Sequence, residues 1–305
     1  MARTPRSLAG AVVAITGGGR GIGRATAVAL IAEGARVAIG DIDAGLAERT
    51  AAELGSGAVG LPLDVTDKAS FAGFLDQLEE RLGALDVLVN NAGIMPIGPF
   101  LEESDAIAER IIDINVNGVI LGSKLALERF VRQGRGHLVN IASTAGKAGV
   151  SGGATYCASK HAVVGLSEAI RQEMRGTGIG VTVVMPHVVN TELGSGLSDT
   201  RGVKLVEPED VAEVIVAALQ TGRYEVYVPP TMGLLLRAKA LVPTAVAEFV
   251  SRLLGGDRTL VDPDHTARAA YEARMAQTAA RTGTTPPITA EQGETTSPEQ
   301  EAQIT

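Results

Sequence analysis

The chain has 305 residues, 45% of them hydrophobic, which is enough for one large domain or for a domain with an extension. Its 27 basic and 35 acidic residues give a formal net charge of −8, and aromatic residues make up only 3% with no tryptophan, which argues against nucleic acid as a partner. A single cysteine excludes an intrachain disulfide framework and a cysteine-based zinc cluster, and the four histidines have no metal-ligand spacing, so we expect no metal site.

The N-terminal residues lack the long apolar core of a signal peptide. No stretch of the chain approaches the roughly 18 uncharged apolar residues that a spanning helix needs. The sequence therefore predicts a cytoplasmic protein without a membrane-spanning segment.

Residues 1–228 alternate short apolar runs with longer helical patterns. The runs predict strands over residues 11–16, 36–40, 58–63, 85–90, 137–142, 181–185 and 224–228. The patterns predict helices over residues 22–33, 44–54, 67–82, 104–132, 155–175 and 208–219. Strands that are apolar throughout suit a parallel sheet covered on both faces, and helical connections imply right-handed crossovers. The sequence thus predicts an α/β fold: a doubly wound, Rossmann-like parallel sheet of about seven strands with helices on both faces.

Beyond residue 228 the pattern changes. Residues 229–254 are apolar with scattered arginine and lysine, and they could cover a pocket or pack in an oligomer, which we favour, or touch a membrane surface. We expect a single catalytic domain over residues 1–255 and a helical extension over 256–282. Residues 283–305, which contain four glutamates and no lysine or arginine, are predicted to be a disordered acidic tail.

The turn between the first strand and the first helix is glycine-rich, with the sequence TGGGRGIG at residues 16–23. Glycine permits positive φ and close approach of the backbone, and the helix N-terminus behind it favours a pyrophosphate. The spacing differs from the commonest dinucleotide fingerprint, and no Gly-Lys-Ser/Thr follows as in a P-loop. The turn still predicts a dinucleotide site rather than a plain tight turn. Its candidate cofactor-binding residues are Gly17, Gly19, Arg20, Gly21, Ile22 and Gly23.

Acidic residues follow the second and third strands. Asp41 can accept hydrogen bonds from both adenosine ribose hydroxyls and would repel the 2′-phosphate of NADP, or it could be a helix N-terminal acid, as Asp43 could. Arg20 could attract a 2′-phosphate, so NAD is favoured and NADP is the alternative. Asp64 and Val65 could contact the adenine, although Asp64 could equally cap the next helix.

Tyr156 and Lys160 lie four residues apart, on one face of the helix expected over 155–175. A cation about 4 Å from a tyrosine can supply the roughly 4 kcal/mol that lowers its pKa from about 10 to about 7. Lys160 can be that cation, which makes Tyr156 the candidate acid/base. The motif Y-x-x-x-K alone is weak evidence for a catalytic pair, because most matches are surface pairs. Here its place in the chain supports the prediction.

Other polar residues follow strands or interrupt a helix. Ser143 could hold a substrate oxygen beside Tyr156, or be an exposed turn serine. Asn115 lies within an expected helix and could hold a water that links Lys160 to solvent, or it could simply face solvent. In the loop after the fourth strand, Asn90 and Gly93 could shape the cofactor floor, or they could belong to a plain turn. The candidate cofactor-binding residues of this loop are Asn91, Ala92 and Gly93.

Together these motifs resemble the short-chain dehydrogenase/reductase family over about residues 8–228. The matches, in the order of the family, are TGGGRGIG at 16–23, Asp64-Val65, NNAG at 90–93, Asn115, Ser143, Tyr156 and Lys160. The resemblance implies NAD(P)-dependent oxidation of an alcohol or reduction of a ketone. It also implies a catalytic tetrad of Asn115, Ser143, Tyr156 and Lys160, with Tyr156 and Lys160 also touching the cofactor.

The resemblance implies further that Pro186, Val189 and Thr191 help to hold the nicotinamide. The family usually has Pro-Gly where this chain has Pro186-His187, and His187 could narrow that site, reach the substrate or be a plain loop residue. The glycine-rich segment 193–206 sits where a substrate lid would, or is a passive loop.

The apolar segment 229–254 looks like the retinol and hydroxysteroid dehydrogenase-like branch, which implies a secondary, apolar alcohol as substrate. Family members are commonly homodimers or homotetramers built through the long helices, here 104–132 and 155–175. One alternative function is an NADPH-dependent carbonyl reductase on the same scaffold. Another is a non-catalytic dinucleotide sensor, against which the complete tetrad argues.

Overall fold

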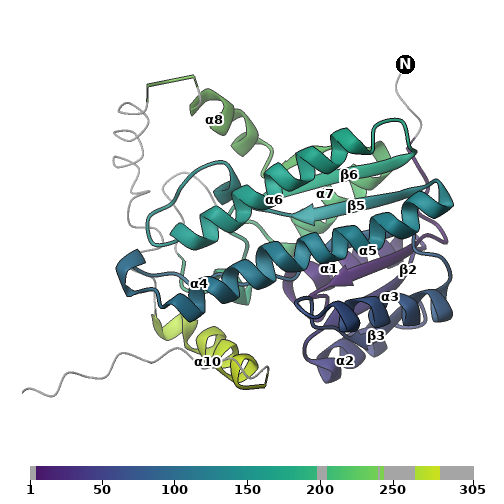
Figure 1. The fold of residues 1–305 in the computed structure, drawn as a ribbon, viewed down its shortest axis with the longest axis horizontal. Coiled ribbons are helices and arrows are strands. Elements are labelled where there is room, and N and C mark those ends of the chain that lie inside the picture. Colours follow the sequence, from purple (N-terminus) through teal and green to yellow (C-terminus); the bar gives the residue numbers. More distant parts are fainter. Residues whose placement is uncertain (1–4, 198–204, 240, 244–264, 282–305) are drawn as a thin grey trace, which may run out of the picture.

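The computed structural model describes residues 5–197, 205–239, 241–243 and 265–281. Its centre is a seven-stranded sheet in the order β3-β2-β1-β4-β5-β6-β7 (Figure 1). Every neighbouring pair of strands is parallel, which confirms the predicted doubly wound sheet. The strands are β1 Val12–Thr16, β2 Arg36–Asp41, β3 Ala58–Pro62, β4 Val87–Asn90, β5 Gly136–Ile141, β6 Ile179–Pro186 and β7 Glu225–Val228.

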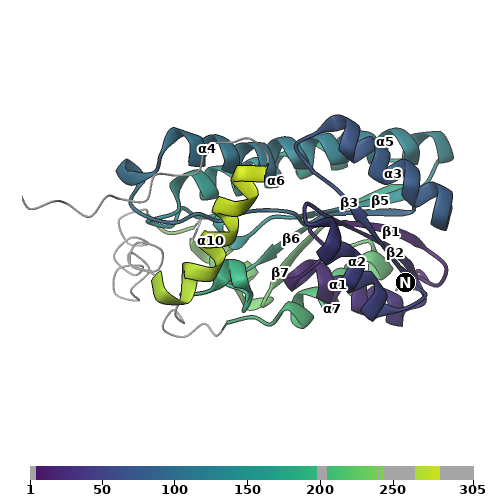
Figure 2. The ribbon, with the colours of Figure 1, turned by 90° about the horizontal axis from the view of Figure 1, so that it is seen from below.

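Helices cover both faces of the sheet, as Figure 2 shows. One face carries α1 Gly21–Ala32, α2 Ala44–Leu54 and α7 Pro208–Thr221. The other carries α3 Lys68–Leu82, α4 Asp105–Ile112, α5 Gly118–Gln133 and α6 Ala154–Glu173. Among the described residues beyond β7 are two further helices, α8 Thr231–Lys239 and α10 His265–Arg281. None of the helices in the described ranges is long and apolar enough to cross a membrane.

The strands are apolar at successive positions because each face of the sheet has its own core. Val13 and Ile15 of β1 pack in a cluster with side chains of α1 and α7. Val12 and Ala14, which point the opposite way, pack in a cluster with side chains of α3 and α5. Full burial of a valine or isoleucine side chain contributes about 1.5–3 kcal/mol, so both faces stabilise the sheet.

The long helix expected over residues 104–132 is continuous, but it is not regular. A π-helical turn, Asp113–Asn117, joins α4 to α5, and its flanking residues keep right-handed helical dihedrals. Such a turn inserts one extra residue and is frequent at functional sites. Hydrophobic periodicity does not reveal it, because the pattern on either side still reads as helix.

The strand order reverses between β1 and β4, which is where ligands bind on open α/β sheets, beyond the carboxyl ends of the strands. Helix α10 lies across this same edge of the sheet (Figure 2). Residues 244–264 and the expected acidic tail over 283–305 lie outside the described residues. Part of the expected lid segment, residues 198–204, does so too.

Candidate active site

A cavity of about 1240 Å³ opens at the carboxyl edge of the sheet. Sites for one small ligand usually measure about 300–1,000 Å³, so this cavity has room for a cofactor and a substrate together. Its walls come from the loops after β1, β2, β3, β4, β5 and β6, from α4, and from the C-terminal helices α8 and α10.

The glycine turn brings the N-terminus of α1 to the cavity. Gly17 and Gly21 have φ of +62° and +50°, where other residues are strained. A Cβ on Gly23 would lie 2.4 Å from the Gly17 carbonyl oxygen, so only glycine lets the helix pack this closely. The N-cap residue of α1 is Arg20, which makes no side-chain cap, whereas aspartates cap α2 and α3. The first N–H groups of α1 are therefore suited to an anion such as a pyrophosphate.

Asp41 at the end of β2 is held with its carboxylate in the cavity wall. One oxygen accepts a hydrogen bond from the Gly19 N–H at 3.2 Å, and the other accepts from the Asp43 N–H at 3.1 Å. Asp43, in contrast, caps α2 through the N–H of Leu46 at 3.0 Å. The sequence left two roles open, a helix cap and a ribose ligand. In the structure Asp43 is the helix cap, and Asp41 faces the cavity.

The same division holds after β3. Asp67 caps α3 by accepting from the N–H of Ser70 at 2.9 Å. Asp64 accepts instead from the N–H and the hydroxyl of Thr66, at 2.9 and 2.7 Å, in a tight turn. Asp64 and Val65 both line the cavity.

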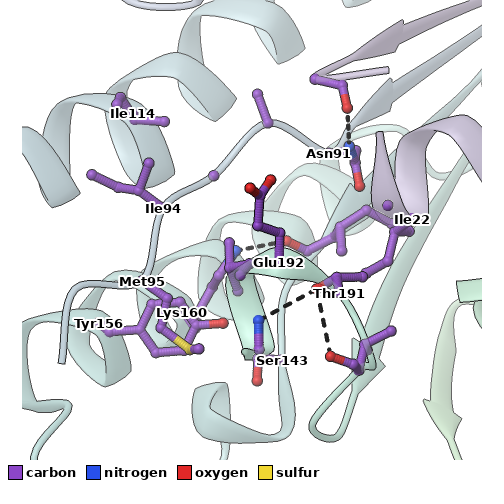
Figure 3. Close-up of a pocket in the computed structure, with 18 of the residues that line it drawn as sticks. Ile22, Asn91, Ile94, Met95, Ile114, Ser143, Tyr156, Lys160, Thr191 and Glu192 are labelled. Atoms are coloured by element: carbon purple, nitrogen blue, oxygen red, sulfur yellow. Dashed lines mark hydrogen bonds between the residues drawn. The ribbon is translucent and has the colours of Figure 1, made fainter. Parts of the chain in front are cut away.

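Asn91 joins the loop after β4 to the glycine turn (Figure 3). Its Nδ2 donates to the carbonyl oxygens of Thr16 and Gly17 at 2.9 and 3.0 Å. The Thr16 hydroxyl accepts from the N–H groups of Asn91 and Ala92 at 3.0 and 2.9 Å. These four bonds fix the two loops that form the floor of the cavity. Asn90 points away from the cavity and donates to Asn140 in the interior, at 2.9 Å.

Tyr156, Lys160 and Ser143 gather at one end of the cavity (Figure 3). Tyr156 and Lys160 are buried side chains of α6, and the Lys160 Nζ lies 5.7 Å from the centroid of the Tyr156 ring. The same Nζ donates to the carbonyl oxygen of Ile141 at 3.1 Å. The Ser143 hydroxyl accepts from the Ala145 N–H at 3.1 Å and donates to the carbonyl oxygen of Pro186 at 3.4 Å.

Burial dominates the protonation equilibria of this group. It raises the pKa of Tyr156 well above its ordinary value, and the neighbouring polar Ser143 side chain opposes that rise only in part. Burial also lowers the pKa of Lys160 to about 8. The expected lowering of the Tyr156 pKa by Lys160 is therefore outweighed by desolvation in the protein alone.

Asn115 is completely buried in the π-helical turn, so it does not face solvent. Its Oδ1 accepts from the Ile94 N–H at 2.9 Å, and its Nδ2 donates to the Ile94 carbonyl oxygen at 2.9 Å. A Cβ on Gly93 would lie 3.1 Å from this Oδ1 and 3.6 Å from the Lys160 Nζ. Asn115 thus braces the loop that runs past Lys160.

The segment after β6 closes the cavity on the other side. Its Pro186, Val189 and Thr191 all line the cavity, as does His187, whose Nδ1 lies 3.2 Å from the Thr144 hydroxyl oxygen. Glu192 pairs with Arg20 of the glycine turn at 3.0 Å.

Most of the predicted site residues line this one cavity. The exceptions are Gly19, Gly23 and Asn115, which support the walls through the contacts described above. Taken together, the open helix N-terminus, the oriented Asp41 carboxylate and the size of the cavity fit a dinucleotide.

A family model described as short chain dehydrogenase matches residues 11–202. The chain belongs to the short-chain dehydrogenase/reductase family. It is therefore an NAD(P)-dependent oxidoreductase that acts on secondary alcohols or ketones.

The relatives of this dehydrogenase act on different alcohols by name. It is 40% identical over 226 residues to 2-(S)-hydroxypropyl-CoM dehydrogenase 3 of Xanthobacter autotrophicus, covering 68% of this chain and 89% of the relative. It is 40% identical over 191 residues to sorbitol dehydrogenase of Cereibacter sphaeroides, covering 62% of this chain and 75% of the relative. A short-chain dehydrogenase/reductase from Burkholderia phymatum, solved with NAD, superposes with a TM-score of 0.71 at 28% identity, covering 77% of this chain and 94% of that one.

Sequence reasoning missed the contribution of α10 to this dehydrogenase's cavity, whereas pocket cover was one of the favoured roles for residues 229–254, which include α8. Tyr271, Arg274 and Met275 of α10 line it, together with Met232 and Leu236 of α8. The helical pattern of the C-terminal region indicated helices but contained no signal for where they pack. The apolar character of residues 229–254 was the one hint that a pocket could be covered there.

Proposed function

We propose that this dehydrogenase oxidises a bulky, apolar secondary alcohol with NAD, using Tyr156 as the acid/base. The observation that supports this most is the burial of Tyr156 beside Ser143 and Lys160, at an end of the cavity that the apolar residues Met95, Ala145 and Leu197 also line. We also propose that residues 1–255 form the single catalytic domain of this enzyme.

Side chains of this protein carry out the proton transfer. Ser143 holds the substrate oxygen by a hydrogen bond, and Tyr156 as phenolate takes the hydroxyl proton. Lys160 stabilises the phenolate by its charge and binds the cofactor ribose, while Asn115 holds the loop beside it. A bound nicotinamide would supply the hydride acceptor for the carbinol carbon. A positioned base of this kind contributes about 10²–10⁴-fold to the rate.

Tyr156 needs more help than Lys160 alone provides, because burial raises its pKa. An oxidised nicotinamide carries a positive charge, and a second nearby cation in a site of low dielectric lowers a phenol pKa. We infer that Tyr156 becomes an effective base only when the oxidised cofactor is present.

Asp41 supports NAD over NADP. Its carboxylate is oriented by two backbone N–H groups at the end of β2, where the adenosine ribose of a dinucleotide lies in this fold. Arg20, which could attract a 2′-phosphate, is instead paired with Glu192. The structural neighbour from Burkholderia phymatum was solved with NAD.

The apolar substrate is inferred from the side chains around Tyr156. A cluster of buried apolar residues surrounds its ring, and it supports our proposal that this enzyme is near the retinol and hydroxysteroid dehydrogenase-like branch. The cluster consists of Met95, Ala145, Cys157 and Leu197, with Ile97, Val150, Val188 and Leu193 packed against it.

The test is Tyr156→Phe in a cofactor-reduction assay over steroid, retinoid, terpenoid and aliphatic alcohols. We expect the wild type to reduce NAD with an apolar alcohol and the variant to lose at least about a hundredfold in kcat. NAD binding, measured by calorimetry, should be unchanged. Turnover retained in Tyr156→Phe would remove the acid/base role, and a clear preference for small polyols would refute the apolar substrate.

Titration of both cofactors in the same assay separates this function from the two alternatives, a carbonyl reductase and a dinucleotide sensor. A much lower KM for NADPH than for NADH, with ketone reduction favoured, would identify a carbonyl reductase. Tight NAD binding without turnover on the whole panel would identify a dinucleotide sensor.

We also propose a homodimer or homotetramer built through α4, α5 and α6. These helices lie together on one face of the sheet (Figure 2), and Val131 of α5 is an exposed apolar side chain there. Sedimentation equilibrium should give a mass of two or four chains, and a monomer at micromolar concentration would contradict the proposal.

A further inference from the structure

Helix α10 lies outside the part of the chain that matches the family, which ends at residue 202. It nevertheless crosses the carboxyl edge of the sheet (Figure 2), where its side chains hydrogen bond to the loops after β4 and β6. Three of its side chains, Tyr271, Arg274 and Met275, line the cavity that contains Tyr156.

Arg268 ties α10 to both loops. Its side chain is 1% exposed, and its Nη2 donates to the carbonyl oxygen of Met95 at 3.0 Å. Its Nη1 donates to the carbonyl oxygens of Leu193 and Ser195, at 3.3 and 2.9 Å. Burying a guanidinium costs several kcal/mol unless its donors are bonded. Both Nη atoms of Arg268 find acceptors where the two loops meet, whereas its Nε makes no hydrogen bond and lies 3.9 Å from a carboxylate oxygen of Glu272. Arg268 therefore fixes the position of α10 on the cavity rim.

Tyr271, almost one helical turn after Arg268, is directed into the cavity. Its hydroxyl oxygen accepts from the Met95 N–H at 2.8 Å, and its side chain is buried. The guanidinium of Arg268 lies 5.0 Å from the centroid of its ring. Met95 packs in the same apolar cluster as Tyr156. Tyr156, Met95 and Tyr271 all line the one cavity, so an apolar substrate held at Tyr156 lies in the cavity that Tyr271 borders.

A second contact holds the helix at the cofactor end. Arg274 pairs with Glu192, which is itself paired with Arg20 of the glycine turn. Helix α10 is thus connected to the glycine turn, to the loop after β4 and to the segment after β6. A helix placed in this way is a wall of the active site and not a separate appendage.

We propose that α10 completes the substrate site, with Tyr271 as a specificity-determining residue that contacts the apolar part of the alcohol. Arg268 is the positioning residue that holds Tyr271 there. The inference rests on the proposed function, because it assumes that the substrate is a bulky apolar secondary alcohol bound beside Tyr156.

The test compares two secondary alcohols in the full chain with NAD: methyl naphthyl carbinol, which is large and apolar, and isopropanol, which is too small to reach Tyr271. Tyr271→Ala should lower kcat/KM for the large alcohol about tenfold, because a ring-sized apolar contact is lost. The value for isopropanol should stay within about twofold. Tyr271→Phe keeps the ring and should keep most of the preference for the large alcohol.

Arg268→Lys tests the positioning role, since lysine keeps the charge but cannot form the fork that reaches three carbonyls. We expect the KM of methyl naphthyl carbinol to rise about tenfold, with kcat and the KM of NAD within about twofold of wild type. A merely structural role would move the KM of NAD and the melting temperature as well. Ala270→Gln, on the exposed face of the same helix, is the matched control and should change none of these values.

Equal losses for both alcohols in Tyr271→Ala, or no loss for either, would overturn the inference while leaving the proposed function intact. If the wild type oxidises neither alcohol, the proposed function fails, and calorimetry with methyl naphthyl ketone still tests α10. If the ketone binds about tenfold more weakly to Tyr271→Ala than to wild type, the result supports α10 as part of the substrate site. Equal binding, or none in wild type, would overturn it.

Discussion

Single aspartates at the end of β2 have different tasks although they are two residues apart. Asp41 and Asp43 are equally plausible helix caps in the sequence, because each follows a strand and precedes a helix. The choice depends on which carboxylate meets the first N–H groups of α2, and that depends on how the chain turns after β2. The structure gives the cap to Asp43 and leaves Asp41 to the cavity.

Asp41→Asn should therefore weaken NAD selectively. The amide keeps the shape but loses the negative charge, and hydrogen bonds to a charged group contribute about 1.5–3 kcal/mol. We expect the KM of NAD to rise about tenfold or more, and the ratio of NADP to NAD utilisation to rise with it. Steady-state titration of both cofactors measures this.

Asp43→Asn is the matched control for that substitution. Asparagine caps helices about as well as aspartate, so helix α2 should keep its N-terminal cap and the KM of NAD should not change. A rise in KM equal to that of Asp41→Asn would show that the loss came from the whole loop, and the ribose role of Asp41 would have to be abandoned.

At the scale of secondary-structure elements, packing of α1 against the glycine turn depends on one missing side chain. A Cβ on Gly23 would lie 2.4 Å from the Gly17 carbonyl oxygen, 2.7 Å from the Asn91 Nδ2 and 2.8 Å from the Gly18 Cα. Two of these atoms belong to the backbone of the turn itself. Relief of the clash must therefore move the turn that we expect to bind the pyrophosphate.

Gly23→Ala should lower the free energy of unfolding by about 1–3 kcal/mol, the usual cost of an overpacked site. It should also weaken NAD binding, because the turn and the start of α1 would separate. Urea unfolding and NAD calorimetry measure the two effects. Gly165→Ala in α6 is the control, since nothing lies within 4 Å of its added Cβ. Alanine there should stabilise the protein by up to about 1 kcal/mol and leave NAD binding unchanged.

Elements defined by local pattern were predictable, and elements defined by distant contacts were not. All seven strands follow from apolar runs, because a strand covered on both faces has no polar side. The π-helical turn was missed, since one inserted residue leaves the periodicity on each side intact. The docking of α10 was missed because it depends on Arg268 meeting carbonyl oxygens more than 70 residues away in the sequence. Patterns within a window of sequence contain nothing about such partners.

For the whole molecule, the edge of the sheet opposite the cavity contains a buried titratable group that has no part in the chemistry. His137 of β5 lies beside β6, and its Nε2 is 2.8 Å from the Thr182 hydroxyl oxygen. That hydroxyl donates to the Arg223 carbonyl oxygen at 2.7 Å, so the His137 Nε2 must be the donor in its own bond. The imidazole is thus a neutral cross-link between strands. Burial, helped by the charge of Arg6, lowers its pKa to about 4.

This cross-link predicts how the stability of the whole fold depends on pH. An unfolded chain protonates His137 near pH 6.5, whereas the folded protein resists protonation down to about pH 4. Between these values the unfolded state binds more protons, so stability is lost as the pH falls and is present in full above pH 6.5. The loss attributable to His137 should approach about 3 kcal/mol.

Urea unfolding of the wild type and of His137→Gln between pH 4 and pH 7 measures this contribution. Glutamine can still donate to Thr182 but does not titrate, so the variant should lose less stability on acidification, even if it is less stable at pH 7. His161→Gln, at an exposed position of α6, should keep the slope of the wild type. If the free energy of unfolding depends on pH equally in His137→Gln and in wild type, the acid sensitivity arises elsewhere. Removing a buried neutral histidine should remove its contribution to that pH dependence.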